Sequence, residues 1–176
     1  LYQLLSGGNP KKIPLQQFIL GIMLDDILTY ANEFFSLLSR GRYSLRRLEG
    51  SAGGNAKSGL DLEVLDGFTG APRSIETLSG GEQFLASLSL AFGLSDVVQS
   101  YSGSVRLDSI FIDEGFGSLD QDTLDTAMKA LSQIQKMGRT VGIISHVSEL
   151  KNRIATQIQV HPSKNGGSSI TMIKDA

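Results

Sequence analysis

The sequence predicts an α/β fold: a parallel sheet with flanking helices, preceded by an N-terminal helix and small antiparallel strands. Two observations lead to this prediction. The second half of the chain alternates helical patterns with short apolar runs, the order expected of parallel strands joined by right-handed crossovers. The first half has one long helical pattern followed by short stretches in which polar and apolar residues alternate.

The composition is that of one soluble domain. The chain has 176 residues, of which 40% are hydrophobic and 19% charged. It has no cysteine, which excludes disulfides, zinc ribbons and thiol catalysis, and its net charge of -2 gives no global attraction to nucleic acid. No secretory signal is visible and the apolar runs are too short to span a membrane, so we expect a cytoplasmic protein. The chain starts at Leu1 without an initiator methionine, and we expect a piece of a longer protein.

The first 39 residues are predicted to form a connector and a helix. Residues 1–14 contain Gly-Gly-Asn-Pro and a lysine pair, which is typical of a connector. From Leu15 to Ser39 apolar residues recur at helical spacing and spread beyond one face. Pro14 suits the first turn of this helix, and Gly41 is expected to end it.

Two short strands are predicted next. Tyr43–Leu48 and Leu60–Leu65 alternate polar and apolar residues, and we interpret residues 50–59 and 67–73 as loops. The loop residues Gly53–Ser58 superficially resemble a phosphate-binding loop. We reject this interpretation because Ala56 stands where a glycine is required and no apolar strand precedes the segment.

The remaining elements alternate. A helix over residues 81–100 is apolar nearly all round and is predicted to be buried. Two fully apolar runs are predicted to be buried parallel strands, and the later elements to end in a hairpin with a turn at Lys164–Gly167. In chain order, the predictions after residue 100 are the strand Ile110–Ile112, the helix Asp120–Met137, the strand Val141–Ile144, the short helix Val147–Arg153, and the strands Thr156–Val160 and Ser169–Ile173.

The segment Leu78–Glu82, here called the glycine turn, is the first candidate for chemistry. Ser79 can cap the following helix, while Gly80 and Gly81 leave its first backbone N–H groups bare, which makes an anion site. The alternative is a plain capping box in which Glu82 reaches back to Ser79. A second Leu-Ser-Gly-Gly at residues 5–8 is followed by Asn-Pro instead of a helix, and we assign it to a turn.

The second candidate is the end of the first apolar strand. Asp113 can hold Mg²⁺ through water, and Glu114 can orient and deprotonate a water molecule. His146 ends the neighbouring parallel strand and should emerge at the same sheet edge, where a neutral imidazole can donate to a phosphate oxygen or to the attacking water. A solvated strand end and a structural histidine are the alternatives.

Asp120 has two interpretations. It is well placed as the N-cap of the next helix, and its loop is also placed to contact the other half of a dimer. The sequence lacks Gly-x-x-x-x-Gly-Lys-[Ser/Thr], the loop that binds nucleotide phosphates. The candidate residues therefore indicate one half of an ATP-hydrolysing site.

These motifs resemble the C-terminal lobe of an ABC-type ATPase head, and in particular the SbcC family. That family comprises the large ATPase subunits of bacterial SbcCD nucleases, which are related to the structural-maintenance-of-chromosomes proteins. Two details differ from transporters: the glycine turn ends in Glu82 instead of Gln, and Gly-Phe-Gly follows Glu114 where transporters usually have Pro-Thr. The resemblance rests on Leu78–Glu82, Phe84–Ser87, Gly93–Val98, Phe111–Asp120 and His146.

The resemblance implies an architecture and roles. Residues 1–14 would connect to a long coiled coil, beyond which an N-terminal lobe carries the phosphate loop, and two such heads would sandwich two ATP molecules. Roles for single residues follow from the same resemblance. ATP held by the other head would contact Ser79, Gly80, Gly81 and Asp120; Mg²⁺ would be supported by Asp113 through water; Glu114 would position water, and His146 would contact the γ-phosphate.

The resemblance also implies partners for an ATP-dependent DNA nuclease. An SbcD-like nuclease subunit would bind near the Leu15–Ser39 helix, and DNA would be handled by the full complex. The cluster Arg40, Arg42, Arg46 and Arg47 is the plausible DNA patch, although we favour a solvated strand edge. Two other hypotheses remain open at this stage: a nucleotide-binding domain of an ABC transporter, and a non-catalytic docking module.

Overall fold

The computed structural model describes residues 6–8, 13–48, 60–103, 107–163 and 166–174. Among these residues, no helix has both the length and the apolar character needed to cross a membrane. The elements in chain order are α2 (Leu15–Leu38), β1 (Tyr43–Arg47), β2 (Leu62–Asp66), β3 (Ala71–Ser74), the 3-10 helix η1 (Ile75–Thr77), α3 (Gly80–Ser102), β4 (Ser109–Asp113), the 3-10 helix η2 (Phe116–Ser118), α4 (Gln121–Lys136), β5 (Thr140–Ile144), α5 (Ser148–Lys151), β6 (Thr156–Pro162) and β7 (Ser168–Lys174).

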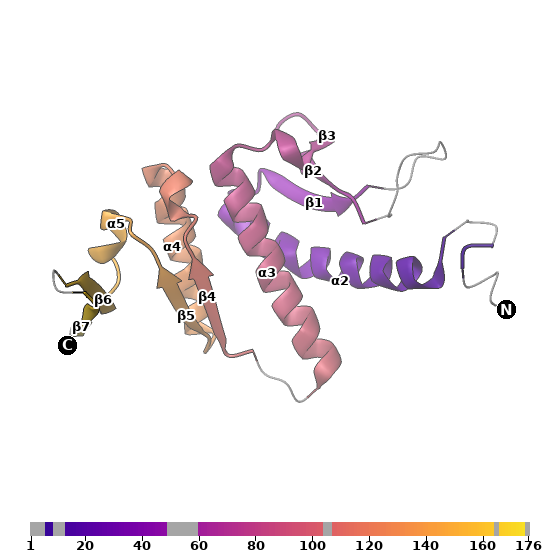
Figure 1. The fold of residues 1–176 in the computed structure, drawn as a ribbon. Coiled ribbons are helices and arrows are strands. Elements are labelled where there is room, and N and C mark those ends of the chain that lie inside the picture. The colour runs from indigo at the N-terminus through magenta and orange to yellow at the C-terminus, as the bar shows by residue number, and fades with distance from the viewer. Residues whose placement is uncertain (1–5, 9–12, 49–59, 104–106, 164–165, 175–176) are drawn as a thin grey trace.

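Helix α3 is the centre of the molecule (Figure 1). Helix α2 and the sheet β1–β2–β3 lie on one side of it, and β4, β5 and α4 lie on the other. Helices α2 and α3 approach closely because Gly93 has no side chain: a Cβ there would lie 2.6 Å from the carbonyl oxygen of Ile27. The rings of Phe34 and Phe92, 5.0 Å apart, fill the space beside this contact.

The three-stranded antiparallel sheet is attached to α2 and faces the start of α3. The amide side chain of Asn32 donates to the carbonyl of Leu45 at 2.8 Å and accepts from its N–H at 2.6 Å, which ties β1 to α2. The loop predicted at residues 67–73 is wrong in its last part, where strand β3 begins at Ala71. Its sequence Ala-Pro-Arg-Ser shows no alternation and contains a proline, which an edge strand tolerates.

Strands β4 and β5 pair in parallel, as predicted, with Ser109 opposite Thr140 and Asp113 opposite Ile144. The prediction that both are buried is wrong. Phe111 is 72% exposed, and Ile112 is the buried apolar residue of β4. The sheet has two strands among the described residues, and α4 packs against one of its faces. An apolar sequence predicts a covered strand, but among the described residues the second face stays exposed at Phe111 and Ile144.

The helix predictions agree with the structure to within a few residues. Helix α2 ends at Leu38, one residue earlier than predicted, and Gly41, which was expected to end it, has a left-handed backbone with φ 77°. The prediction that helix α3 is buried holds for its middle: its buried residues lie between Leu85 and Val97, while Leu94 is 50% and Tyr101 63% exposed. Its buried apolar residues join those of α2, β1, β2, β4, η2, α4 and α5 in one core, whose largest fully buried members are Phe35, Phe92, Phe116, Leu45 and Val64.

The chain closes with the predicted hairpin. Strands β6 and β7 pair antiparallel, with Ile158 opposite Met172 and Val160 opposite Ile170, and all four side chains are exposed. Three predictions lie wholly or partly outside the described residues: most of the connector 1–14, the whole loop 50–59 with its segment Gly53–Ser58, and residues 164 and 165 of the hairpin turn. Within the described part of the connector, residues 6 and 7 form the turn expected of the second Leu-Ser-Gly-Gly.

Candidate functional site

The glycine turn begins α3 through a complete capping box. The Ser79 hydroxyl accepts from the Glu82 N–H at 3.3 Å, and the Ser79 N–H donates to Glu82 Oε2 at 2.8 Å. Gly80 is exposed and Gly81 is partly exposed. The hydroxyl acts as acceptor in the cap, so its own proton remains able to donate outward. Ser79 can therefore cap the helix and bind an anion at the same time, so the two interpretations of this sequence are compatible.

The glycine turn packs against the loop that carries Asp120. A Cβ on Gly81 would lie 3.3 Å from Leu119 Cδ2 and 3.4 Å from the carbonyl oxygen of Ser118. Asp120 is the N-cap of α4: its Oδ1 accepts from the Thr123 N–H at 2.8 Å, and this bond holds the pKa of Asp120 below its usual value. A cavity of about 710 Å³ opens between these segments, lined by residues 79–82 and 118–123 together with side chains of α2, β1 and the segment between them.

The end of β4 turns sharply. The Glu114 N–H donates to the Ile144 carbonyl at 2.9 Å, which extends the β4–β5 ladder by one residue. Glu114 has φ 62°, a left-handed conformation that is strained for a residue with a side chain. Gly115 follows with φ 95°, and a Cβ there would lie 2.2 Å from the ring of Phe84. The strained turn directs the Glu114 carboxylate toward the end of β5.

Glu114 and His146 meet at this edge. The Nδ1 atom of His146 lies 3.1 Å from Oε1 and 3.0 Å from Oε2 of Glu114, and both side chains are largely exposed. An ionised carboxylate only accepts, so Nδ1 carries the proton in this contact and Nε2 of the neutral ring is an acceptor. In this arrangement Nε2 of the neutral ring can accept a hydrogen bond from water, and it can donate to a phosphate oxygen only when the ring is protonated. This refines the predicted role of a neutral donor.

The predicted Mg²⁺ site rests on one carboxylate, that of Asp113. Asp113 ends β4 and is exposed, and it makes no hydrogen bond or ion pair with any described side chain. No group of three or more candidate ligands gathers anywhere in the described ranges. This arrangement suits Mg²⁺, which takes one or two protein carboxylates and fills its shell with water and phosphate oxygens.

The candidate residues fall into two groups. Ser79, Gly80, Gly81 and Asp120 line the cavity beside the glycine turn. The second group, Asp113, Glu114 and His146, lies at the carboxyl edge of β4 and β5 and does not line that cavity. The first group thus lies at the cavity and the second at the strand edge, and no hydrogen bond or ion pair among the described residues joins the two groups.

The four arginines predicted as a possible DNA patch are engaged within the chain. Arg42 binds Asp66 at 3.2 Å, Arg46 binds Glu63 at 2.9 Å and Arg47 binds Asp25 at 2.7 Å. Arg40 donates to the Thr126 hydroxyl at 3.0 Å and the Asp122 carbonyl at 3.4 Å. In the three ion pairs, the positive charges of Arg42, Arg46 and Arg47 are neutralised by carboxylates of the same chain. This favours a structural role for these arginines over DNA binding.

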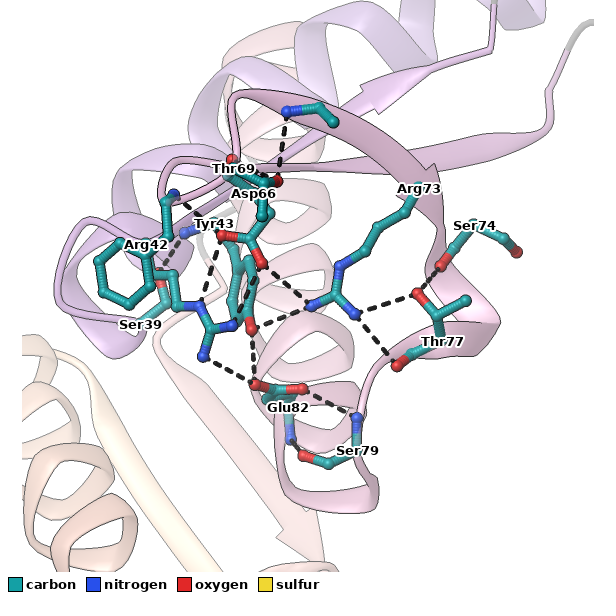
Figure 2. A network of polar contacts seen from close by, with 12 residues as sticks. Ser39, Arg42, Tyr43, Asp66, Thr69, Arg73, Ser74, Thr77, Ser79 and Glu82 are labelled. Carbon is teal, nitrogen blue, oxygen red and sulfur yellow. Dashed lines mark hydrogen bonds and ion pairs between the residues drawn. The ribbon is translucent and has the colours of Figure 1, made fainter.

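A polar network behind the glycine turn was not predicted. Asp66 is 3% exposed and binds both Arg42 and Arg73, and Tyr43 joins this cluster to Glu82 (Figure 2). Burial raises the pKa of the Asp66 carboxyl, but the hydrogen bonds from Arg42 and the Phe68 N–H and the charges of Arg42 and Arg73 together outweigh this effect, and the pKa lies below its usual value. The capping-box spacing identifies Glu82, whereas nothing in the sequence connects Tyr43 or Arg73 to it.

Comparison with known proteins identifies the family. Residues 57–133 match the family model "SbcC/RAD50-like, Walker B motif". The chain is 52% identical over 166 residues to the SbcC subunit of nuclease SbcCD from Vibrio cholerae and 49% identical over 160 residues to that from Staphylococcus aureus. These alignments cover 94% and 91% of the chain, but the chain spans only 16% of each relative's length.

Solved structures agree on the fold. A structure titled "Structural biochemistry of ATP-driven dimerization and DNA stimulated activation of SMC ATPases" matches with a TM-score of 0.65 and 19% identity, covering 90% of this chain and 89% of that one. The SMC head domain from Thermotoga maritima matches with a TM-score of 0.59 and 19% identity, covering 91% of this chain and 52% of that one. The chain is therefore an SbcC-like segment that belongs to the SbcC/RAD50-like family and has the fold of an SMC head domain.

Proposed function

We propose that this segment is one half of the ATP-binding and ATP-hydrolysing head of a DNA-repair nuclease complex. It supplies the glycine turn, the acidic strand end, the Asp120 loop and His146, while the phosphate loop comes from an N-terminal lobe of the same protein. Its relatives are SbcC subunits of the nuclease SbcCD, which supports a nuclease complex. The structures of SMC heads support an ATPase head as the working unit.

The distribution of the site residues over two surfaces is the observation that carries the proposal. A single closed site would have the glycine turn and the Glu114–His146 pair lining one cavity. Instead Glu114 contacts His146, and the glycine turn opens into its own cavity beside Asp120. Two surfaces on one lobe suit a dimer of heads with two ATP molecules between them. Each head would then contact one ATP through its strand edge and the other ATP through its glycine turn.

Each residue then has a role that suits its surroundings. The bare amides of Gly80 and Gly81 and the outward proton of Ser79 bind the terminal phosphate held by the partner head. Glu114 orients and deprotonates the attacking water, and His146 fixes the carboxylate through Nδ1. Asp113 is the carboxylate suited to hold Mg²⁺, which supplies positive charge to the phosphates when bound.

Two exposed apolar surfaces support the proposed partners. The open face of β4 and β5, which includes Phe111 and Ile144, suits coverage by the protein's own N-terminal lobe. The first half of α2 exposes Leu15, Phe18, Ile19 and Ile22, each at least 45% accessible, which suits docking of an SbcD-like nuclease subunit. Since the arginines of β1 are paired, DNA contact is assigned to other parts of the complex.

The first test changes the carboxylate. In the full-length protein with its nuclease subunit, Glu114→Gln should leave ATP binding intact and lower ATP turnover by about 10²–10⁴-fold, the contribution of a general base. Nucleotide binding and steady-state hydrolysis are measured side by side. The segment alone should hydrolyse no ATP, and turnover by the segment would contradict the half-site arrangement.

The second test asks whether the glycine turn acts across the dimer. Ser79→Arg and Glu114→Gln should each inactivate the homodimer. An equimolar mixture should recover about a quarter of wild-type turnover, because half of random pairs are mixed and each mixed pair has one intact site of two. No recovery in the mixture would show that Ser79 and Glu114 serve the same ATP.

A further inference from the structure

Glu82 connects the glycine turn to a cluster behind it. One carboxylate oxygen, Oε2, accepts from the Ser79 N–H at 2.8 Å, and the other, Oε1, accepts from the Tyr43 hydroxyl at 2.7 Å. The phenol therefore fixes the carboxylate that fixes the first residue of the turn. Figure 2 shows this path, which joins the start of β1 to the start of α3.

Tyr43 is itself held from several directions. Arg73 Nη2 donates to its oxygen at 3.0 Å, the Arg42 guanidinium lies 4.6 Å from its ring centroid, and Phe35 stacks on it at 5.9 Å. Burial and the hydrogen bond to Glu82 raise the pKa of Tyr43 to about 12. The hydroxyl therefore stays protonated at neutral pH and remains a donor to the carboxylate.

The charges of this cluster are balanced. Four charged groups face one another: Arg42 of the turn before β1, Asp66 of β2, Arg73 of β3 and Glu82 of α3. Burial raises the pKa of Glu82, but the hydrogen bonds from Tyr43 and the Ser79 amide lower it, and the net result lies below the usual value. A carboxylate one residue beyond Gly81 would repel an anion at the turn, so its orientation and neutralisation matter for phosphate binding.

We propose that Tyr43 is a positioning residue for ATP hydrolysis: by hydrogen bonding Glu82 it holds the carboxylate back and keeps the Gly80 and Gly81 amides facing the phosphate of the partner head. The inference rests on the proposed function. It concerns an interaction made in the closed dimer, so it predicts an effect on turnover and pairing of heads and none on ATP binding by a single head.

The test compares two tyrosines in the full-length protein with its nuclease subunit. Tyr43→Phe removes the donor and keeps the ring. Tyr101→Phe is the matched control, because Tyr101 also donates to a carboxylate, Asp26 Oδ2 at 2.6 Å, at an exposed site away from the glycine turn. Tyr43→Phe should lower kcat about tenfold, the size expected for one hydrogen bond to a charged group, with ATP affinity of single heads unchanged. Tyr101→Phe should match the wild type.

Two further measurements separate positioning from loss of folding. Without the phenol the pKa of Glu82 rises, so the acidic limb of the pH–turnover profile should move to higher pH in Tyr43→Phe. In a Glu82→Gln background the same substitution should change kcat less than twofold, because its route through the carboxylate is gone. If the role of Tyr43 were purely structural, the acidic limb would stay in place. The effects of Tyr43→Phe and Glu82→Gln on kcat would then multiply in the double variant, and this result would overturn the inference.

The outcomes distinguish this inference from the proposed function. If the wild-type protein forms ATP-dependent dimers and hydrolyses ATP while Tyr43→Phe matches Tyr101→Phe, the positioning role is wrong and the proposed function stands. If the wild-type heads neither pair with ATP nor hydrolyse it, the proposed function fails and this inference falls with it.

Discussion

The contact between α2 and α3 at Gly93 makes a stability prediction. In Gly93→Ala the new Cβ would lie 2.6 Å from the Ile27 carbonyl oxygen and 2.7 Å from the Ala31 nitrogen. Both are backbone atoms, so no side chain can rotate away, and the helices must separate by roughly 0.8 Å to reach ordinary contact at 3.4 Å. Overpacking of this kind costs about 1–3 kcal/mol, and the gain in helix propensity returns about 1 kcal/mol. We expect a net loss of up to about 2 kcal/mol.

The assay is urea unfolding, with Gly21→Ala as the control. Gly21 is also a helical glycine, but its Cβ would meet only the flexible Arg47 side chain, at 3.4 Å or more. That variant should be as stable as the wild type or up to about 1 kcal/mol more stable. Gly93→Ala should lower the unfolding midpoint without changing the slope m. A Gly93→Ala protein as stable as the control would refute the argument from backbone contact.

Two more substitutions probe the site and its support. Gly115→Ala places a Cβ 2.2 Å from the Phe84 ring on a left-handed backbone, so it should displace Glu114 and reduce ATP turnover of the full-length protein more than it reduces ATP binding; equal losses of both would argue against this cause. Asp66→Asn tests the lowered pKa. Ionised Asp66 stabilises the fold above its ordinary pKa of about 3.9, and this contribution is lost as the pH falls through the lower folded-state pKa. Urea midpoints should therefore differ between wild type and Asp66→Asn at pH 7, and the difference should shrink as the pH falls below the ordinary pKa of about 3.9.

The helix starts were predictable because their signals are local. Ser79 and Asp120 cap α3 and α4 through bonds that reach only three residues along the chain. The meeting of Glu114 and His146 was also predictable, because parallel strands end at one edge and both residues lie just beyond the ends of their strands. The roles of these residues in catalysis remain predictions until the variants are measured.

The remaining features depend on contacts between distant segments. The Tyr43–Glu82 bond joins residues 39 positions apart and requires the register of a sheet whose third strand has no sequence pattern. The left-handed backbone of Glu114 arises where Gly115 passes under the Phe84 ring, which no local motif announces. The exposure of Phe111 was missed because apolar runs indicate that a strand will be covered but do not say by which segment.

The exposed edges and face of the β4–β5 sheet also affect the solubility of the segment. Among the described residues both of its outer edges lack a neighbouring strand, and its uncovered face is apolar. Unpaired edges beside apolar surface are templates for strand addition between molecules. If the N-terminal lobe proposed above covers this face, the segment without that lobe should aggregate, and co-expression of the lobe should keep the segment soluble.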